Sequence, residues 1–229
     1  MNVLNWVLDP DPPSRPGAAM TIAFPASRPL VLADLLPGTL ARDAVLVVGA
    51  AGFVGATAQL SVHLPGTPVP VTGQTLGVLL SGAALGWRRA MASLALYLLV
   101  GVLGFPWFAG HSSGVGASFG YVIGFVAAAT IVGALAGRGG DRTPLRMLAS
   151  MVAGNALIYL FGMTYLALDL HLGAGATIRE GLRPFLVGDA VKAVIAAGLL
   201  PGAWALINRS GTDTSRPHQE AGGPESRSG

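Results

Sequence analysis

Long runs of apolar residues alternate with short polar segments over most of the chain. A helix needs roughly 20 apolar residues to cross a bilayer, so runs of this kind predict membrane helices. The second and third runs are short and are expected to be tilted or extended by their flanks; the second could also be broken or partly re-entrant. The six runs lie at residues 44–62, 75–86, 90–104, 119–137, 145–168 and 185–207.

Composition supports a membrane protein. The 229 residues are 52% hydrophobic and only 11% charged, and the mean hydropathy is +0.61. A soluble domain carries about 25% charged residues, so this chain could not cover a soluble surface. The chain has no cysteine, which excludes disulfides, thiolate metal sites and a cysteine nucleophile. The net charge of +3 comes from scattered arginines rather than a basic stripe, so nucleic-acid binding is not expected.

The arginines predict the orientation. Positive residues favour the cytoplasmic side of a membrane. With a cytoplasmic N-terminus, the outer side receives only Arg179 and Arg183, both in the last outer loop. The first two outer loops contain neither Lys nor Arg. The sequence therefore predicts an all-α integral membrane protein with six transmembrane helices and both termini in the cytoplasm.

The ends of the chain differ from its centre. Residues 1–42 are rich in proline and charge and predict a cytoplasmic extension without a cleaved signal peptide; Met1 and Met20 could each be the start. Residues 43–208 form the predicted membrane domain. Residues 209–229 are polar and rich in Ser and Gly, which predicts a disordered cytoplasmic tail.

The last apolar run contains an aspartate and the only lysine of the chain, in the stretch "VGDAVKAV". Asp189 and Lys192 are three residues apart, so a helix places them on one face. Ionisable residues inside a membrane are costly and usually mark a functional site. A buried ion pair that only joins two helices is the alternative, and a proton or ion relay is a third.

Other polar positions are weaker candidates. Asn155 and Tyr159, in "GNALIYLFG", share a helix face and either hydrogen-bond to another helix or contact a substrate. Ser118 and Tyr121 begin the fourth run and could be interface anchors. The proline-rich outer loop "HLPGTPVPVTGQT" is either a plain connector or a shaped lid over a small-molecule site.

Small residues four apart recur in the first run, as Ala51 with Gly55 and Gly52 with Ala56. Such spacing allows close helix packing within the chain, and it also provides a smooth surface on which another membrane protein could dock.

An enzyme is the alternative class. "GHSSG" (Gly110 to Gly114) fits the G-x-S-x-G pattern of hydrolases, but that motif needs a strand before it and a helix after it. Here it falls in a glycine-rich outer loop. A membrane-embedded hydrolase or acyltransferase, using these serines or the Asp189–Lys192 pair, is therefore only the second reading. The chain also has no P-loop for ATP.

Several motifs in order resemble the BioY family, the biotin-specific substrate-binding (S) components of energy-coupling factor (ECF) transporters. They are "TPVPVTGQTLGVLLSGAALGWRRAMASLALYLLVGVLGFPWFAG", "GYVIGF", "GNALIYLFGMTYLAL" and "RPFLVGDAVKAVIAA". The resemblance covers roughly residues 43–207. It departs from the family at Gly73, where leucine is usual, and at "GASFGY", where "GPTGGY" is usual.

The resemblance implies six helices and a biotin site beneath the first outer loop, in the bacterial cytoplasmic membrane. It implies partners, namely a membrane coupling subunit and two ATP-binding cassette subunits that hydrolyse ATP, while this chain binds no cofactor. Docking would use Ala51 with Gly55 or Gly52 with Ala56. An S component for another vitamin is the remaining alternative. The implied or candidate biotin-binding residues are Asp189, Lys192, Thr72, Gln74, Asn155, Tyr121, Tyr159 and Phe105.

Overall fold

A computed structural model describes residues 31–36 and 40–212, and these residues are mostly helical. The elements, in chain order, are the 3-10 helix η1 (Leu32–Leu35), α1 (Leu40–Gln59), β1 (Ser61–Val62), β2 (Val71–Thr72), α2 (Gln74–Leu85), α3 (Trp87–Val102), the 3-10 helix η2 (Ala109–His111), α4 (Phe119–Ala136), α5 (Pro144–Asp169), α6 (Ala174–Gly181) and α7 (Arg183–Thr212).

Each of the six apolar runs lies mainly in a helix, so the described residues are mostly helical, as predicted, apart from the short strand pair β1–β2. Four helices are long and apolar enough to cross a membrane: α1, α4, α5 and α7. α2 has 12 residues and α3 has 16, in agreement with the expectation that these two are short. The additional helix α6 has only eight residues and was not predicted.

The short helix α2 lies in the interior and contacts α1, α3, α4 and α7. Most of its residues are buried, so protein rather than lipid surrounds it. Glycine allows this close approach, because a Cβ at Gly82 would lie 2.7 Å from the backbone oxygen of Ala129 in α4. Gly86 then takes a φ of +78° and turns the chain directly into α3.

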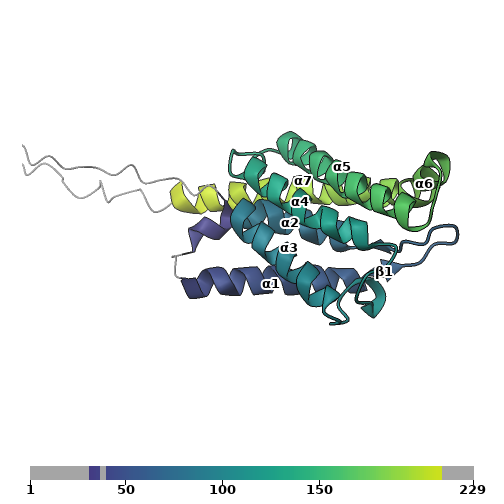
Figure 1. The fold of residues 1–229 in the computed structure, drawn as a ribbon. Helices are drawn as coiled ribbons and strands as arrows, with labels where there is room; N and C mark the ends of the chain where they lie inside the picture. Colours follow the sequence, from purple (N-terminus) through teal and green to yellow (C-terminus); the bar gives the residue numbers. More distant parts are fainter. Residues whose placement is uncertain (1–30, 37–39, 213–229) are drawn as a thin grey trace, which may run out of the picture.

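The helices run side by side, with the start of α1 and the end of α7 at one end of the bundle (Figure 1). The opposite end carries α6 and the antiparallel pair β1–β2, in which Ser61 is paired with Thr72 (Figure 1). The chain crosses between these ends in successive helices. The turns after α2 and α4 therefore lie at the end where α1 starts, which we call the Leu40 end.

Ionic contacts hold the elements together at the Leu40 end. Arg89 of α3 pairs with Asp34 at 2.9 Å and with Asp43 of α1 at 3.2 Å. In the turn after α4, the buried Asp141 accepts a hydrogen bond of 2.5 Å from Nε1 of Trp204 in α7. Burial raises the pKa of the Asp141 carboxyl, and the hydrogen bond from Trp204 opposes this rise.

The boundaries predicted for the N-terminal extension and the C-terminal tail differ from those in the structure. α7 continues to Thr212, so the first residues of the polar tail expected from 209 are helical. Within the expected extension (residues 1–42), Leu32–Leu35 form η1, Val31 before it and Ala33 in it are buried, and residues 40–42 already belong to α1. Residues 1–30, 37–39 and 213–229 lie outside the described residues, and with them most of the extension and of the tail.

Candidate functional site

A cavity lies between the helices near the β1–β2 hairpin. The space not filled by atoms here amounts to about 510 Å³, part of which is open to solvent at the mouth of the cavity. Residues of α2, α4, α5 and α7, of the β1–β2 hairpin and of the segment between α3 and α4 reach it. Its lining residues are Val69, Pro70, Thr72, Gln74, Thr75, Phe108, Ala109, Ser118, Tyr121, Val122, Phe125, Ile158, Tyr159, Phe185, Asp189 and Lys192.

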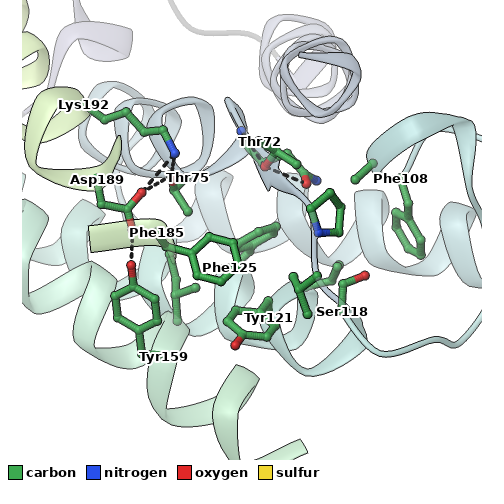
Figure 2. A pocket seen from close by; sticks show the side chains of 16 residues that line it. Thr72, Thr75, Phe108, Ser118, Tyr121, Phe125, Tyr159, Phe185, Asp189 and Lys192 are labelled. Carbon is green, nitrogen blue, oxygen red and sulfur yellow. Dashed lines mark hydrogen bonds and ion pairs between the residues drawn. The ribbon is translucent and has the colours of Figure 1, made fainter. Parts of the chain in front are cut away.

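A charged cluster occupies one side of the cavity (Figure 2). Lys192 Nζ lies 3.0 Å from Asp189 Oδ1 and donates to Thr75 Oγ1 at 2.8 Å. The Thr75 hydroxyl donates in turn to Asp189 Oδ1 at 3.0 Å. Tyr159 donates its phenolic hydrogen to Asp189 Oδ2. The carboxylate is thus buried, and both of its oxygens accept hydrogen bonds, as expected for a charge inside a membrane protein.

The cluster joins three helices. Asp189 and Lys192 are one turn apart on α7, Thr75 lies in the first turn of α2, and Tyr159 comes from α5. The predicted shared helix face is therefore confirmed, with the ion pair at i and i+3. The pair does connect helices, as a purely structural ion pair would, but it also lines a cavity. A role confined to packing would not require the pair to line a cavity.

A second polar group is formed where β2 meets α2. The Thr72 hydroxyl donates to Gln74 Oε1 at 3.2 Å and accepts from the Gln74 backbone N–H at the same distance. Thr72 lies apart from the charged cluster, and the rings of Phe125 and Phe185 lie below both in the view of Figure 2. Ser118 reaches the cavity from the start of α4. The cavity thus has polar groups on two sides and aromatic side chains between them.

Glycines let the aromatic side chains reach the cavity wall. A Cβ at Gly162 of α5 would lie 2.3 Å from the ring of Tyr121 in α4, so only glycine leaves room for that ring. The Tyr121 hydroxyl donates to the backbone oxygen of Gly181 at 2.7 Å. Gly101 of α3 leaves similar room for Phe108, whose ring lies 2.1 Å from the position of a Cβ there.

Two predicted site residues do not line the cavity. Phe105 is 57% exposed, and its ring packs edge-on against Trp107 outside the cavity, so it does not provide a wall. Asn155 lies one helical turn from Tyr159, toward the Leu40 end, and lines an apolar groove between α5 and α7. The cavity ends at the level of Ile158 and Tyr159, which explains why Asn155 stays outside it.

Several lining residues were missed by the sequence analysis. Thr75 stands in the quoted motif directly after Gln74, and its distance to Asp189 could not be read from a sequence. Phe108 takes the place expected of Phe105. Its signal would have been the small residue at Gly101, which its ring covers. Phe125 and Phe185 resembled ordinary apolar positions of membrane helices.

The small residues of α1 divide into two sets. Ala51 is buried, and Gly55 is in contact with the Trp107 side chain, so this pair packs inside the chain. Gly52 and Ala56 are exposed, and nothing lies within 4 Å of a Cβ at Gly52. Only the second pair lies on a free face of the described structure.

The hydrolase pattern has no matching architecture. Ser112 is exposed, and its hydroxyl donates to the backbone oxygen of Ala109 at 2.8 Å. The only strands in the described part of the chain are two residues long, so they supply no strand–turn–helix elbow there. The same part of the chain brings together no three His, Asp or Glu residues that could hold a metal ion.

The sequence is similar to those of known transport proteins. It is 34% identical over 168 residues to the biotin transporter BioY of Rhizobium etli, a match that covers 68% of this chain and 89% of that protein. It is 36% identical over 156 residues to the probable biotin transporter BioY of Pyrococcus horikoshii, covering 68% and 92%. These relatives are named as transporters, not enzymes.

The fold is also similar to a solved structure. A crystal structure of the S-component for biotin from an ECF-type ABC transporter matches with a TM-score of 0.66 at 18% identity, over 74% of this chain and 95% of that chain. The helical arrangement and the similar transporters together describe a multi-pass membrane protein. The sequence profile of the BioY family matches residues 26–209, and the chain therefore belongs to the BioY family.

Proposed function

We propose that this chain binds biotin and serves its uptake across the bacterial cytoplasmic membrane, as the substrate-binding component of an ECF-type ABC transporter. Two relatives, each matched over about nine-tenths of its own length, are named as a biotin transporter and a probable biotin transporter. The similar solved structure is named as an S-component for biotin. The observation that carries the proposal for this chain is the Asp189–Lys192 pair, which lines a cavity with apolar and aromatic walls.

The cavity matches the chemistry of biotin. Biotin has a ureido group with two N–H donors and a carbonyl, an apolar ring that contains a thioether, and a carboxylate on a flexible arm. The cavity has polar groups at Asp189 and Lys192 and again at Thr72 and Gln74, and the wall between them is apolar. A ligand that is polar at both ends and apolar in the middle satisfies both groups at once.

The charges of Asp189 and Lys192 favour one orientation of biotin in the cavity. Asp189 and Lys192 together are neutral, and the ureido group is also neutral. Asp189 would accept from a ureido N–H, and Lys192 would donate its third ammonium hydrogen to the ureido oxygen. The ligand carboxylate in the same place would leave an uncompensated buried charge beside Asp189, which is costly. The ureido group therefore binds at Asp189 and Lys192, and the carboxylate lies toward Gln74 and Ser118.

The proposed topology has six spans with both termini in the cytoplasm. Its support is the distribution of arginines, because Arg42, Arg88, Arg89, Arg138 and Arg142 belong to segments at the Leu40 end, and Arg179 and Arg183 to the α6 end. Positive residues favour the cytoplasmic side. The short helix α2 crosses within the bundle, where other helices shield it. The 16-residue helix α3 packs against α1, α2 and α4 with its other face exposed.

The proposed partners are a membrane coupling subunit and two ATP-binding cassette subunits, which would use ATP while this chain binds none. The exposed pair Gly52 and Ala56 on α1 supports a docking face, since small residues allow a partner helix to approach closely. Ala51 and Gly55 are already packed within the chain and are not part of this face.

The test is equilibrium binding of labelled biotin to the purified full chain, with unlabelled biotin, thiamine and riboflavin as competitors. We expect saturable binding that unlabelled biotin displaces and the other two vitamins do not. Absence of saturable binding, or equal displacement by thiamine or riboflavin, would overturn the proposal.

A further inference from the structure

Tyr97 of α3 is fully buried and does not line the cavity, yet its hydroxyl touches a residue that does. Gln74 Nε2 donates to the Tyr97 hydroxyl at 2.7 Å. The Tyr97 hydroxyl donates to the backbone oxygen of Trp107 at 3.0 Å. The phenol is therefore a link between the cavity and the loop that follows α3.

The order of donors along this link is determined by chemistry. A backbone carbonyl only accepts, so the single hydrogen of the Tyr97 hydroxyl goes to Trp107. The hydroxyl then has only acceptor capacity left for Gln74, and the amide must turn its NH₂ group toward Tyr97. At the other side of the amide, the Thr72 hydroxyl accepts the Gln74 backbone N–H and donates to Gln74 Oε1.

This order leaves one donor of Gln74 for a ligand. The NH₂ group carries two hydrogens, and Tyr97 accepts one. The second has no acceptor in the described part of the chain, and Gln74 lines the cavity with only 4% of its surface exposed. Without the Tyr97 hydroxyl the amide could rotate by half a turn and present its oxygen to the same ligand atoms.

The loop side of the link is held independently of the hydroxyl. Trp107 Nε1 donates to the Tyr97 backbone oxygen at 3.0 Å, and the two rings are in contact with centroids 5.0 Å apart. Gln59 of α1 also donates to the backbone oxygens of Trp107 and Phe108, at 3.2 and 3.3 Å. Removing only the Tyr97 hydroxyl thus leaves the loop anchored.

We propose that Tyr97 is a positioning residue that orients the Gln74 amide, so that its free N–H faces the carboxylate of the bound ligand and the site prefers an acid over the corresponding neutral amide. The inference rests on the proposed function and on the ligand orientation given there. Tyr97 acts through Gln74 and does not touch the ligand.

The test compares binding of biotin and of its carboxamide, biotinamide, to the purified full chain. We expect the wild type to bind biotin at least about tenfold more tightly than biotinamide, because a hydrogen bond to a charged group is roughly twice as strong as a neutral one. In Tyr97→Phe, which keeps the ring, we expect this ratio to fall to about threefold or less and the affinity for biotin to fall about tenfold.

Gln59→Met is the matched control, since it removes hydrogen bonds to the same loop without touching Gln74. It should leave the ratio of the two affinities unchanged, even if both fall. Gln74→Met should abolish the preference, and adding Tyr97→Phe to it should not change the ratio further. A packing role for Tyr97 would instead lower both affinities equally and keep the ratio.

The outcomes separate the two proposals. If the wild type does not bind biotin, the proposed function fails. If the wild type binds biotin and prefers the acid, but Tyr97→Phe keeps the full preference, the function stands and the role of Tyr97 is wrong. A wild type that binds biotin and biotinamide equally also overturns the inference, since no preference would then exist for Tyr97 to set.

Discussion

One hydroxyl group joins the two charged side chains at the cavity. Thr75 Oγ1 accepts a hydrogen bond from Lys192 and donates one to Asp189. It thereby holds the ammonium and the carboxylate in a common orientation toward a ligand. A hydrogen bond to a charged group contributes about 1.5–3 kcal/mol, so its loss should be measurable.

Thr75→Val removes the hydroxyl and keeps the branched shape. We expect the affinity for biotin to fall by about 10- to 100-fold, because Asp189 and Lys192 each lose a partner next to the ligand. Isothermal titration of the purified variant measures this. Thr130→Val is the control, since the Thr130 hydroxyl bonds only to the backbone oxygen of Val126 in its own helix. Wild-type affinity in Thr75→Val would contradict the proposed role.

At the residue scale, the sequence predicted that Asp189 and Lys192 share a helix face, and the structure has them paired at the cavity. The prediction was possible because charge in an apolar run is costly wherever it points. The sequence could not separate Asn155 from Tyr159, which share a helix face but lie a turn apart in depth. It also could not choose between Phe105 and Phe108. That choice depends on the space that Gly101 of α3 leaves for the Phe108 ring, and this contact joins two segments whose packing a sequence does not show.

Glycines bring α4 and α5 unusually close together. A Cβ at Gly124 of α4 would lie 2.9 Å from Cα of Ile158, and one at Gly120 would lie 2.2 Å from Cβ of Tyr165. Gly162 provides the corresponding space on α5 for Tyr121. This contact positions three lining residues of the cavity, namely Tyr121, Ile158 and Tyr159.

Gly162→Ala should push the Tyr121 ring toward the cavity and separate the helices. Overpacking of this kind costs about 1–3 kcal/mol, so we expect a lower thermal midpoint together with weaker biotin binding. Both are measured on purified protein in detergent. Gly198→Ala in α7 is the control, because a Cβ there meets nothing within 4 Å. If both variants behave alike, the α4–α5 contact does not shape the cavity.

At the element scale, hydropathy predicted the six apolar helices because burial in lipid or protein dominates their sequences. The helix boundaries differ from the predicted runs by a few residues where the flanking residues continue the helix. α1 thus begins at Leu40 rather than at residue 44, and α7 ends at Thr212 rather than at residue 207. α6 escaped notice because its sequence is short and only weakly apolar. The interior position of α2 depends on contacts with α1, α3, α4, α5 and α7, which no local pattern reveals.

The whole molecule has one end rich in arginine and another that opens to the cavity. If the Leu40 end faces the cytoplasm, the cavity lies near the outer surface, where an extracellular vitamin would enter. The natural chain has no cysteine, so single cysteines report sidedness without background.

Ser113→Cys in the outer loop should react with a membrane-impermeant maleimide in intact cells. Arg138→Cys in the turn after α4 should react only after the cells are permeabilised. Both native residues are exposed, so accessibility to water does not limit the reaction. Labelling of Arg138→Cys in intact cells would refute the proposed orientation.

Docking to a coupling subunit is also a property of the whole molecule. Gly52→Leu introduces a large side chain where nothing of this chain lies within 4 Å. We expect the purified variant to keep its affinity for biotin, while uptake by cells that contain all subunits falls at least about tenfold, because the partner helix can no longer approach closely.

Gly198→Leu makes the same change on the exposed face of α7 and should affect uptake less. Normal uptake with Gly52→Leu, or equal losses with both variants, would argue against docking at Gly52 and Ala56.

The most direct measurement is binding of labelled biotin to the purified chain with and without the charged pair. We predict that Asp189→Asn and Lys192→Met each weaken binding by at least about a hundredfold, because each leaves the other group unpaired next to the ligand. Circular dichroism should show that both variants keep their helices. Asp169→Asn at the exposed end of α5 should bind as the wild type does. Wild-type affinity in both Asp189→Asn and Lys192→Met would contradict the account.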